Sequence, residues 1–81
     1  MSVTVYVADG CPHCRRLLDD LRRRHVAFVC VDLSAAPERA AEVVRLTWDR
    51  RLPVVVDHER FTVGFDGASS TFAELGLAPH E

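Results

Sequence analysis

The sequence has no run of apolar residues long enough to cross a membrane. Its longest uninterrupted run, Val26 to Val31, is far shorter than the roughly 18 residues that suggest a membrane span. The first residues, Met1 to Val5, have neither the charged start nor the cleavage site of a signal peptide, so we expect a cytoplasmic protein. Lysine, asparagine, glutamine and isoleucine are absent, which indicates coding bias in a GC-rich genome rather than a function.

An excess of positive charge is also missing. Ten basic residues, all of them arginine, stand against twelve acidic residues, and the formal net charge is -2. That balance gives no support for nucleic acid or an anionic membrane as a partner. With 48% apolar and 27% charged residues, the 81-residue chain has the composition of a globular protein, and its length predicts one domain over residues 1–81.

Cysteine is scarce, and three cysteines are too few for the disulfide scaffold of a secreted protein. Two of them form the motif Cys11-Pro12-His13-Cys14. In an apparently cytosolic chain, a C-x-x-C pair indicates redox chemistry or metal binding. A structural zinc site needs four ligands, often from two such pairs, whereas here one pair is accompanied only by the distant Cys30 and scattered histidines. We therefore favour redox chemistry.

The apolar pattern predicts the element order β-α-β-α-β-β-α. The predicted strands are Val3–Val7, Val26–Val31, Leu52–Val56 and Phe61–Val63. Helices are expected from Pro12 to about Arg24 and after the connector Ser34–Pro37. A short third helix is expected after Gly67, with Phe72, Leu75 and Leu77 as its apolar residues and Gly76 as the residue that ends it. Strands that alternate with helices form a parallel β-α-β unit, and the last two strands form a hairpin. The fold class is therefore α/β, with a four-stranded mixed sheet and helices on both faces.

The cysteine pair lies where the first strand ends and the first helix begins. The free N–H groups and the positive dipole end of a helix N-terminus favour thiolate at Cys11, and thiolate is the form that attacks disulfides. Pro12 stiffens the turn, and the i,i+3 spacing brings Cys14 close enough for a disulfide. His13, when protonated, and Arg15 add positive charge. We expect Cys11 to be the attacking thiol and Cys14 the resolving thiol.

Together with this motif, the element order resembles that of the glutaredoxin family, and the resemblance covers essentially the whole chain. Cys11-Pro12-His13-Cys14 is similar to the family's C-P-x-C site, and Arg50-Arg51-Leu52-Pro53 stands where glutaredoxins have R-T-V-P. Val63-Gly64-Phe65-Asp66 stands where they have G-G-x-D. The resemblance implies a thioredoxin fold and a thiol-disulfide oxidoreductase without a tightly bound cofactor.

The resemblance also implies substrate-binding residues. Pro53 would be a cis-proline facing the thiols, and Leu52 would offer its backbone N–H and C=O to an extended thiol substrate. The turn with Gly64, Phe65 and Asp66 would hold the γ-glutamyl end of glutathione as co-substrate, although Asp66 can equally be a helix N-cap. Glutaredoxins usually carry Lys three residues before the nucleophile. Here Ala8 and Asp9 occupy that region, so Arg50 or Arg51 would have to supply the positive charge.

Three alternatives stay open on the sequence. The chain also resembles the NrdH-type redoxins, which take electrons from thioredoxin reductase, although their usual central dipeptide is Val-Gln. A non-catalytic module could instead bind extended peptides at the Leu52-Pro53 edge, and a dimer could hold an iron–sulfur cluster through Cys11 and glutathione. Disulfide-containing proteins are the expected substrates, and a monomer is the expected state.

Two further residues are predicted to serve packing rather than chemistry. Cys30 lies in the middle of a predicted strand and is expected to be a small buried apolar residue. Trp48 is expected in the core or packed near the Leu52-Pro53 loop.

Overall fold

A computed structural model describes residues 3–77 of the chain. The elements follow in the order β1 (Val3–Val7), α1 (Pro12–Arg23), β2 (Phe28–Asp32), a 3-10 turn η1 (Pro37–Arg39), α2 (Ala40–Thr47), β3 (Arg51–Leu52), β4 (Val54–Val56), β5 (Phe61–Val63) and β6 (Ser70–Thr71). Among the described residues, no helix is both long and apolar enough to cross a membrane.

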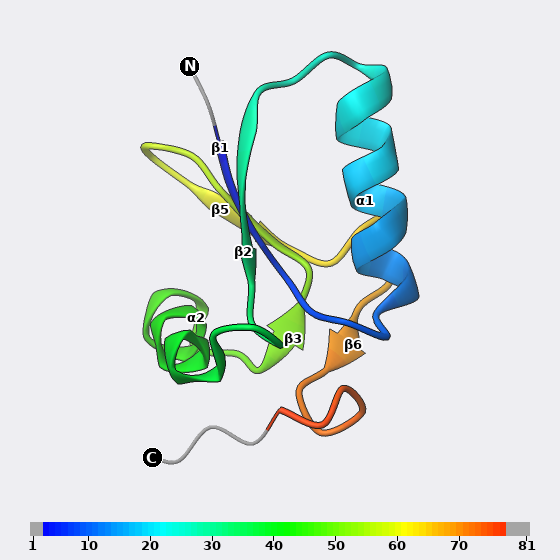
Figure 1. Cartoon of the computed structure of the whole chain (residues 1–81). Coiled ribbons are helices and arrows are strands. Elements are labelled where there is room, and N and C mark those ends of the chain that lie inside the picture. Colours follow the sequence, from blue (N-terminus) through cyan, green and yellow to red (C-terminus); the bar gives the residue numbers. More distant parts are fainter. Residues whose placement is uncertain (1–2, 78–81) are drawn as a thin grey trace.

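The main sheet has four strands in the order β2-β1-β4-β5 and is mixed, as the sequence predicts. β1 pairs in parallel with β2 and antiparallel with β4, and β4 and β5 form the expected hairpin. Figure 1 shows α1 on one side of this sheet and α2 on the other. The expected arrangement, with helices on both faces, is therefore confirmed.

Alternating side chains of β1 connect the two layers, because neighbouring residues of a strand point to opposite faces. Val5 is fully buried and Val7 lines the space beneath α1. Tyr6 points to the other face, where its hydroxyl donates a 3.2 Å hydrogen bond to Glu42 of α2. The core is mostly aliphatic, with Tyr6 and Phe72 as its buried aromatic residues, and it includes both Cys11 and Cys14, so the cysteine pair is anchored in the core.

The predicted strand Leu52–Val56 is not continuous, and that expectation is wrong in detail. Pro53 interrupts it, because proline has no N–H to donate to a strand ladder. β4, beyond the proline, belongs to the main sheet, whereas β3 pairs antiparallel with β6 in a separate two-stranded sheet. The residues before and after Pro53 therefore pair with strands of two different sheets.

The third predicted helix is also wrong: the described chain forms a single turn there. Asp66 and Gly67 both have positive φ, 54° and 77°, which is typical of a type I′ turn, and Phe65 and Ala68 exchange backbone hydrogen bonds of 2.7 and 3.0 Å. The chain then runs extended through β6. Among the described residues, Phe72 to Leu77 form one turn, which is capped by reciprocal Thr71–Glu74 hydrogen bonds and ended by the left-handed Gly76.

Candidate active site

Cys11 is the N-cap residue of α1, as its position in the sequence predicts. Its backbone is extended, with φ -97° and ψ 103°, and Pro12 occupies the first helical position, where a missing N–H costs nothing. The backbone N–H of Cys14 donates to Cys11 Sγ at 3.1 Å. A helix N-terminus therefore presents an N–H donor directly to this sulfur, which is an arrangement that stabilises negative charge on it.

Cys11 and Cys14 form a disulfide, with their Cα atoms 5.2 Å apart. Both residues are buried, with exposed fractions of 4% and 2%. The pair can therefore exchange two electrons without a change of fold, because the i,i+3 spacing holds the two sulfurs together at the start of α1.

His13 lies between Pro12 and Cys14, half-buried, with its Nδ1 atom enclosed. Within residues 3–77 this nitrogen has no hydrogen-bond partner. His13 therefore lies in the first turn of α1, directly before Cys14 of the disulfide.

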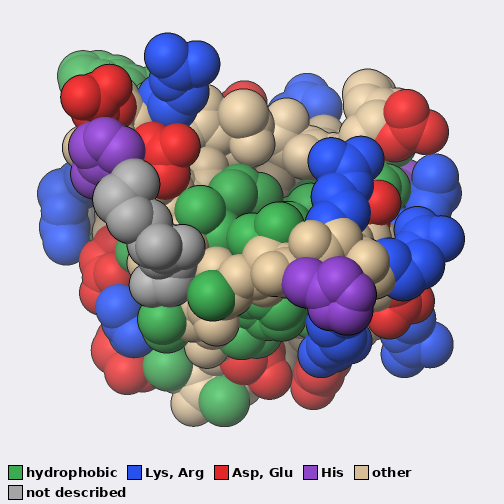
Figure 2. All heavy atoms as spheres, turned by 90° about the horizontal axis from the view of Figure 1, so that it is seen from above, with side chains coloured by type: hydrophobic (Ala, Val, Ile, Leu, Met, Phe, Trp, Pro, Cys, Tyr) green, Lys and Arg blue, Asp and Glu red, His purple; other side chains and the backbone are tan. Residues whose placement is uncertain are grey.

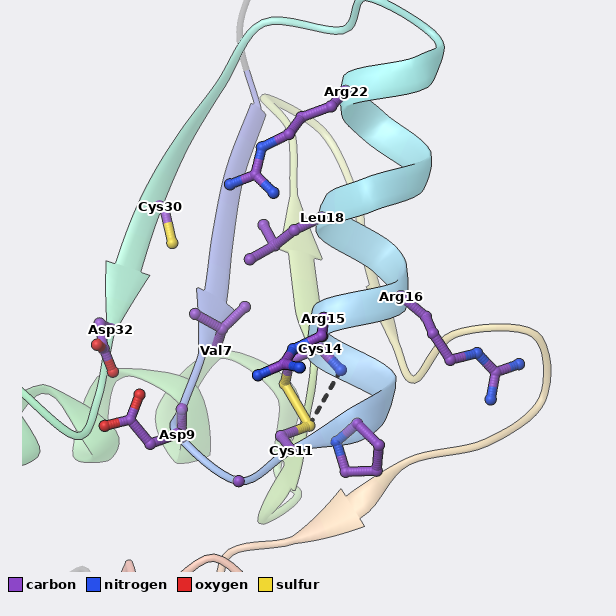
Figure 3. A pocket seen from close by; sticks show the side chains of 13 residues that line it. Val7, Asp9, Cys11, Cys14, Arg15, Arg16, Leu18, Arg22, Cys30 and Asp32 are labelled. Atoms are coloured by element: carbon purple, nitrogen blue, oxygen red, sulfur yellow. Dashed lines mark hydrogen bonds between the residues drawn. A yellow bond between two sulfur atoms is a disulfide. The ribbon is translucent and has the colours of Figure 1, made fainter.

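A groove of about 790 Å³ runs from the cysteine pair along α1, over β1 and β2. Figure 3 shows Arg15, Leu18 and Arg22 pointing from α1 toward the strands. Asp9 and Asp32 lie on the opposite wall. Positive and negative side chains thus face each other across the groove that leads to the disulfide.

Cys30 lies in this groove and is exposed, so the prediction of a buried packing residue is wrong. It belongs to β2, an edge strand of the sheet, and its side chain lies on the same face as Val5, its register partner. Desolvation against the groove wall, followed by the charge of Asp32, raises the pKa of the Cys30 thiol, and Arg22 opposes the shift. These surroundings disfavour thiolate, the reactive form.

Leu52 and Pro53 are both buried, and the peptide bond between them is cis, as the resemblance implies. Leu52 belongs to the same buried cluster as the two cysteines. The Pro53 carbonyl accepts a 2.7 Å hydrogen bond from the Gly64 N–H. The structure thus ties the proline loop to the turn that follows β5, which brings together two of the three motifs that the sequence singles out.

The backbone of Leu52 faces β6, and this departs from what the resemblance implies. The Phe72 N–H donates to the Arg50 carbonyl at 2.9 Å, and Leu52 is the register partner of Ser70. Hydrogen-bonded pairs recur at every second residue of an antiparallel ladder, so Leu52 and Ser70 form the next such pair. The edge expected to receive an extended substrate is therefore occupied by the chain itself.

Arg50 and Arg51 are exposed on this same edge. Arg51 lies 3.5 Å from the Asp49 carboxylate and donates to Ser69 Oγ at 3.3 Å. The backbone N–H of Arg50 donates to Asp49 Oδ1 at 2.8 Å. Arg50 thus precedes β3 and Arg51 is its first residue, and the Asp49 carboxylate offsets part of the charge of Arg51.

The turn with Gly64, Phe65 and Asp66 contacts α1 through Arg16. The Arg16 guanidinium lies 3.9 Å from the Asp66 carboxylate and 5.9 Å from the centre of the Phe65 ring. No helix begins at Asp66 among the described residues, so the N-cap interpretation of this residue is wrong. The sequence did not indicate the Arg16 contact, because an arginine on the polar face of a helix has no local signal for a distant partner.

The prediction that Trp48 is packed in the core or near the Leu52-Pro53 loop is wrong, because the exposed fraction of this residue is 91%. It follows the last residue of α2 as the C-cap, with a left-handed backbone at φ 60° and ψ 25°. Apolar character predicted burial, but the backbone reversal that ends α2 turns the ring into solvent.

Comparison with known proteins agrees with this geometry. The Glutaredoxin family model matches residues 3–61. A glutaredoxin from Archaeoglobus fulgidus is 26% identical with a TM-score of 0.71, over 79% of this chain and 75% of that one. The glutaredoxin-like NrdH-redoxin from Escherichia coli is 27% identical with a TM-score of 0.69, over 100% of both chains. Comparison with curated protein sequences gives no significant match. With the family model matching well over half of its length and the cysteine pair at the start of α1, the chain belongs to the glutaredoxin family.

Proposed function

We propose that the protein reduces protein disulfides and glutathione mixed disulfides through Cys11 and Cys14. The observation that carries this proposal is the disulfide at the N-terminus of α1, where the Cys14 N–H donates to Cys11 Sγ. The family and the NrdH-redoxin neighbour support thiol-disulfide oxidoreductase activity in general. A reducing compartment, the cytoplasm, is the proposed setting.

The reaction balances as two successive exchanges. In the reduced protein, the Cys11 thiolate attacks one sulfur of the substrate disulfide, and the other substrate sulfur leaves as a thiolate that takes a proton from water. The Cys14 thiol then loses its proton and attacks Cys11 Sγ. This step releases the second substrate thiol and forms the Cys11–Cys14 disulfide, so the substrate gains the two electrons that the cysteine pair loses.

The order of the two cysteines is tested by serine variants. Cys14→Ser keeps the attack but loses the resolution, so it accumulates a mixed disulfide that intact-mass spectrometry detects. Cys11→Ser forms none, because Cys14 lies inside α1 and is the more buried of the two residues. The reverse pattern would show that the assigned roles are wrong, and the absence of an adduct in both variants would favour a non-catalytic peptide-binding module.

Glutathione is the proposed electron donor. Arg50, Arg51, Gly64, Phe65 and Asp66 retain part of the site that the resemblance implies, with Pro53 and the Leu52 backbone beside it. Ala8 and Asp9 remove a positive charge. In addition, Arg51 and Asp66 already have the ionic partners Asp49 and Arg16. Each lost charge-assisted contact costs about one to two decades in affinity, so we expect weaker binding than in a glutaredoxin that keeps the lysine.

Thioredoxin reductase is the second candidate donor, because the neighbour that matches over the full length is an NrdH-redoxin whose activity profile is described as thioredoxin-like. The two donors are separated by feeding the oxidised protein with NADPH and either glutathione plus its reductase or thioredoxin reductase. We expect NADPH consumption with glutathione. Consumption only with thioredoxin reductase would replace the glutathione proposal with the NrdH-type one.

A further inference from the structure

Trp48 combines two costs, an exposed ring and a left-handed backbone, and its one described backbone contact is the 2.8 Å hydrogen bond from its N–H to the Val44 carbonyl that ends α2. Its indole is 91% exposed, the highest value among the exposed large hydrophobic residues. Its backbone is left-handed at φ 60°, a conformation that bulky side chains rarely adopt. His25 and Asp66 also have positive φ, but histidine and aspartate tolerate this region far better. An outlier of this kind, held in place by the surrounding structure, points to a function for the side chain.

The position of Trp48 in the chain places it shortly before the proline loop. It precedes Pro53 by five residues, so the two residues are at most about 18 Å apart along the chain. Figure 1 shows the connection from α2 to β3 in the same half of the molecule as the start of α1 and β6. A polypeptide segment of modest length whose disulfide is at Cys11 can therefore extend as far as the indole.

The charge around Trp48 indicates the chemistry of that segment. Arg45, Arg50 and Arg51 surround it in sequence and are all exposed, whereas Asp49 is the one acidic residue between them. Tryptophan and arginine are the residues that most often dominate binding energy at protein interfaces. A partner with negative charge fits this stretch, and a positively charged one does not.

We propose that Trp48 and Arg45, together with the Arg50–Arg51 edge, form a docking surface for an acidic polypeptide segment next to the disulfide of a protein substrate. This inference rests on the proposed function only in assigning a disulfide to the partner. The indole packs against the segment and the guanidinium groups attract its carboxylates, so Trp48 and Arg45 select among protein substrates without contributing to the reduction of small disulfides.

Binding is measured without any redox step. The probe is a dye-labelled peptide of about eight residues, long enough in extended form to span the distance, with serine in place of cysteine and flanking Glu and Asp residues. A matched peptide carries Lys in place of the acidic residues. We expect the acidic peptide to raise the fluorescence anisotropy and the basic one to leave it unchanged. Because the chain contains one Trp, its emission should also shift to the blue when the acidic peptide binds.

The variants separate docking from folding. Trp48→Gly removes the ring and also removes the left-handed strain, so it should fold at least as well as the parent, which thermal unfolding checks. We expect it to weaken acidic-peptide binding about tenfold or more, with Trp48→Phe intermediate and Arg45→Ser weakened in a salt-dependent manner. Phe61→Thr, which removes another exposed aromatic side chain, on the β4–β5 hairpin, should bind like the parent.

A separate assay distinguishes failure of the inference from failure of the proposed function. The reduction of bis(2-hydroxyethyl) disulfide, with dithiothreitol as the electron source, tests Cys11 and Cys14 alone and should be equal in the parent and in Trp48→Gly. Absence of this activity in the parent refutes the proposed function, while the peptide titration still decides the docking surface. Equal peptide affinity in Trp48→Gly and the parent, or no binding at all, overturns the docking inference. So does a dimer of the parent that Trp48→Gly dissociates, because the ring would then contact a second copy.

Discussion

Gly64 is the position at which a single added methyl group should most disturb the described site. Its φ is +91°, and a Cβ atom built on it would lie 2.9 Å from the carbonyl oxygen of Ala68. That oxygen is part of the backbone and accepts a 2.7 Å hydrogen bond from the Phe65 N–H, so it cannot move away without weakening the turn. The Gly64 N–H also donates to the Pro53 carbonyl at 2.7 Å, which links the turn to the proline loop.

The cost of Gly64→Ala can be estimated from these contacts. The left-handed conformation costs an L-residue about 1–2 kcal/mol, and loss or distortion of a backbone hydrogen bond adds roughly 1–2 kcal/mol. The total is about 2–4 kcal/mol, which lowers the melting temperature of a domain this size by on the order of 10–25 °C. Gly67→Ala is the matched control, because Gly67 has φ +77° and open space at its Cβ position. It should cost only about 1–2 kcal/mol, since the strain is the same and the clash is absent.

Urea unfolding followed by circular dichroism measures both variants against the parent. We expect Gly64→Ala to unfold at a clearly lower urea concentration than Gly67→Ala, with a difference of about 1–2 kcal/mol in the free energy of unfolding between them. In the folded Gly64→Ala protein, the rate of disulfide reduction should also fall, because the clash with Ala68 displaces the backbone N–H that donates to the Pro53 carbonyl. Equal midpoints for the two alanine variants would refute the reasoning, because the contact with Ala68 would then carry no cost.

Three further results are expected. In the reduced protein, alkylation of Cys11 with iodoacetamide should have its midpoint below the value of about 8.5 for a free thiol, and a midpoint at that value would contradict a role for the helix N-terminus. Cys30→Ser should leave the turnover of small disulfides within about twofold of the parent, since its surroundings disfavour thiolate. Burial, together with the hydrogen bond to Glu42, raises the pKa of Tyr6, so its contribution to stability is complete below about pH 10 and is lost as the pH rises further. Tyr6→Phe should remove this alkaline decline and cost about 1 kcal/mol near neutral pH, which urea titrations at several pH values check.

The sequence predicts best where local chemistry and the fold agree. Pro12 at the first helical position and Cys11 as its N-cap are local signals, and α1 begins where they indicate. The alternation of strands and helices likewise predicted the main sheet, because parallel strands require a crossover between them. At these positions the tertiary structure adds little that the local sequence does not already contain.

The predictions that are wrong concern residues whose structure depends on contacts with distant parts of the chain. The apolar residues Phe72, Leu75 and Leu77 indicate a helix, yet the stretch before them pairs with β3, and the described residues from Phe72 to Leu77 form one turn. Cys30 is exposed because β2 is an edge strand, and its sequence alone does not reveal its place in the sheet. Trp48 is exposed because the end of α2 needs a left-handed residue, which apolar character cannot indicate.

The position of β6 connects these corrections to the chemistry. A substrate strand at Leu52 and the Ser70 segment use the same backbone groups, so they exclude one another. The pairing of β6 is short, two residues against two, and a sheet of this size has little stability of its own. A substrate that replaces it forms hydrogen bonds of the same kind and gains little net energy from the exchange. Discrimination among protein substrates must therefore come from side-chain contacts beyond Leu52, and the exposed residues that continue this edge are Arg51, Arg50 and Trp48.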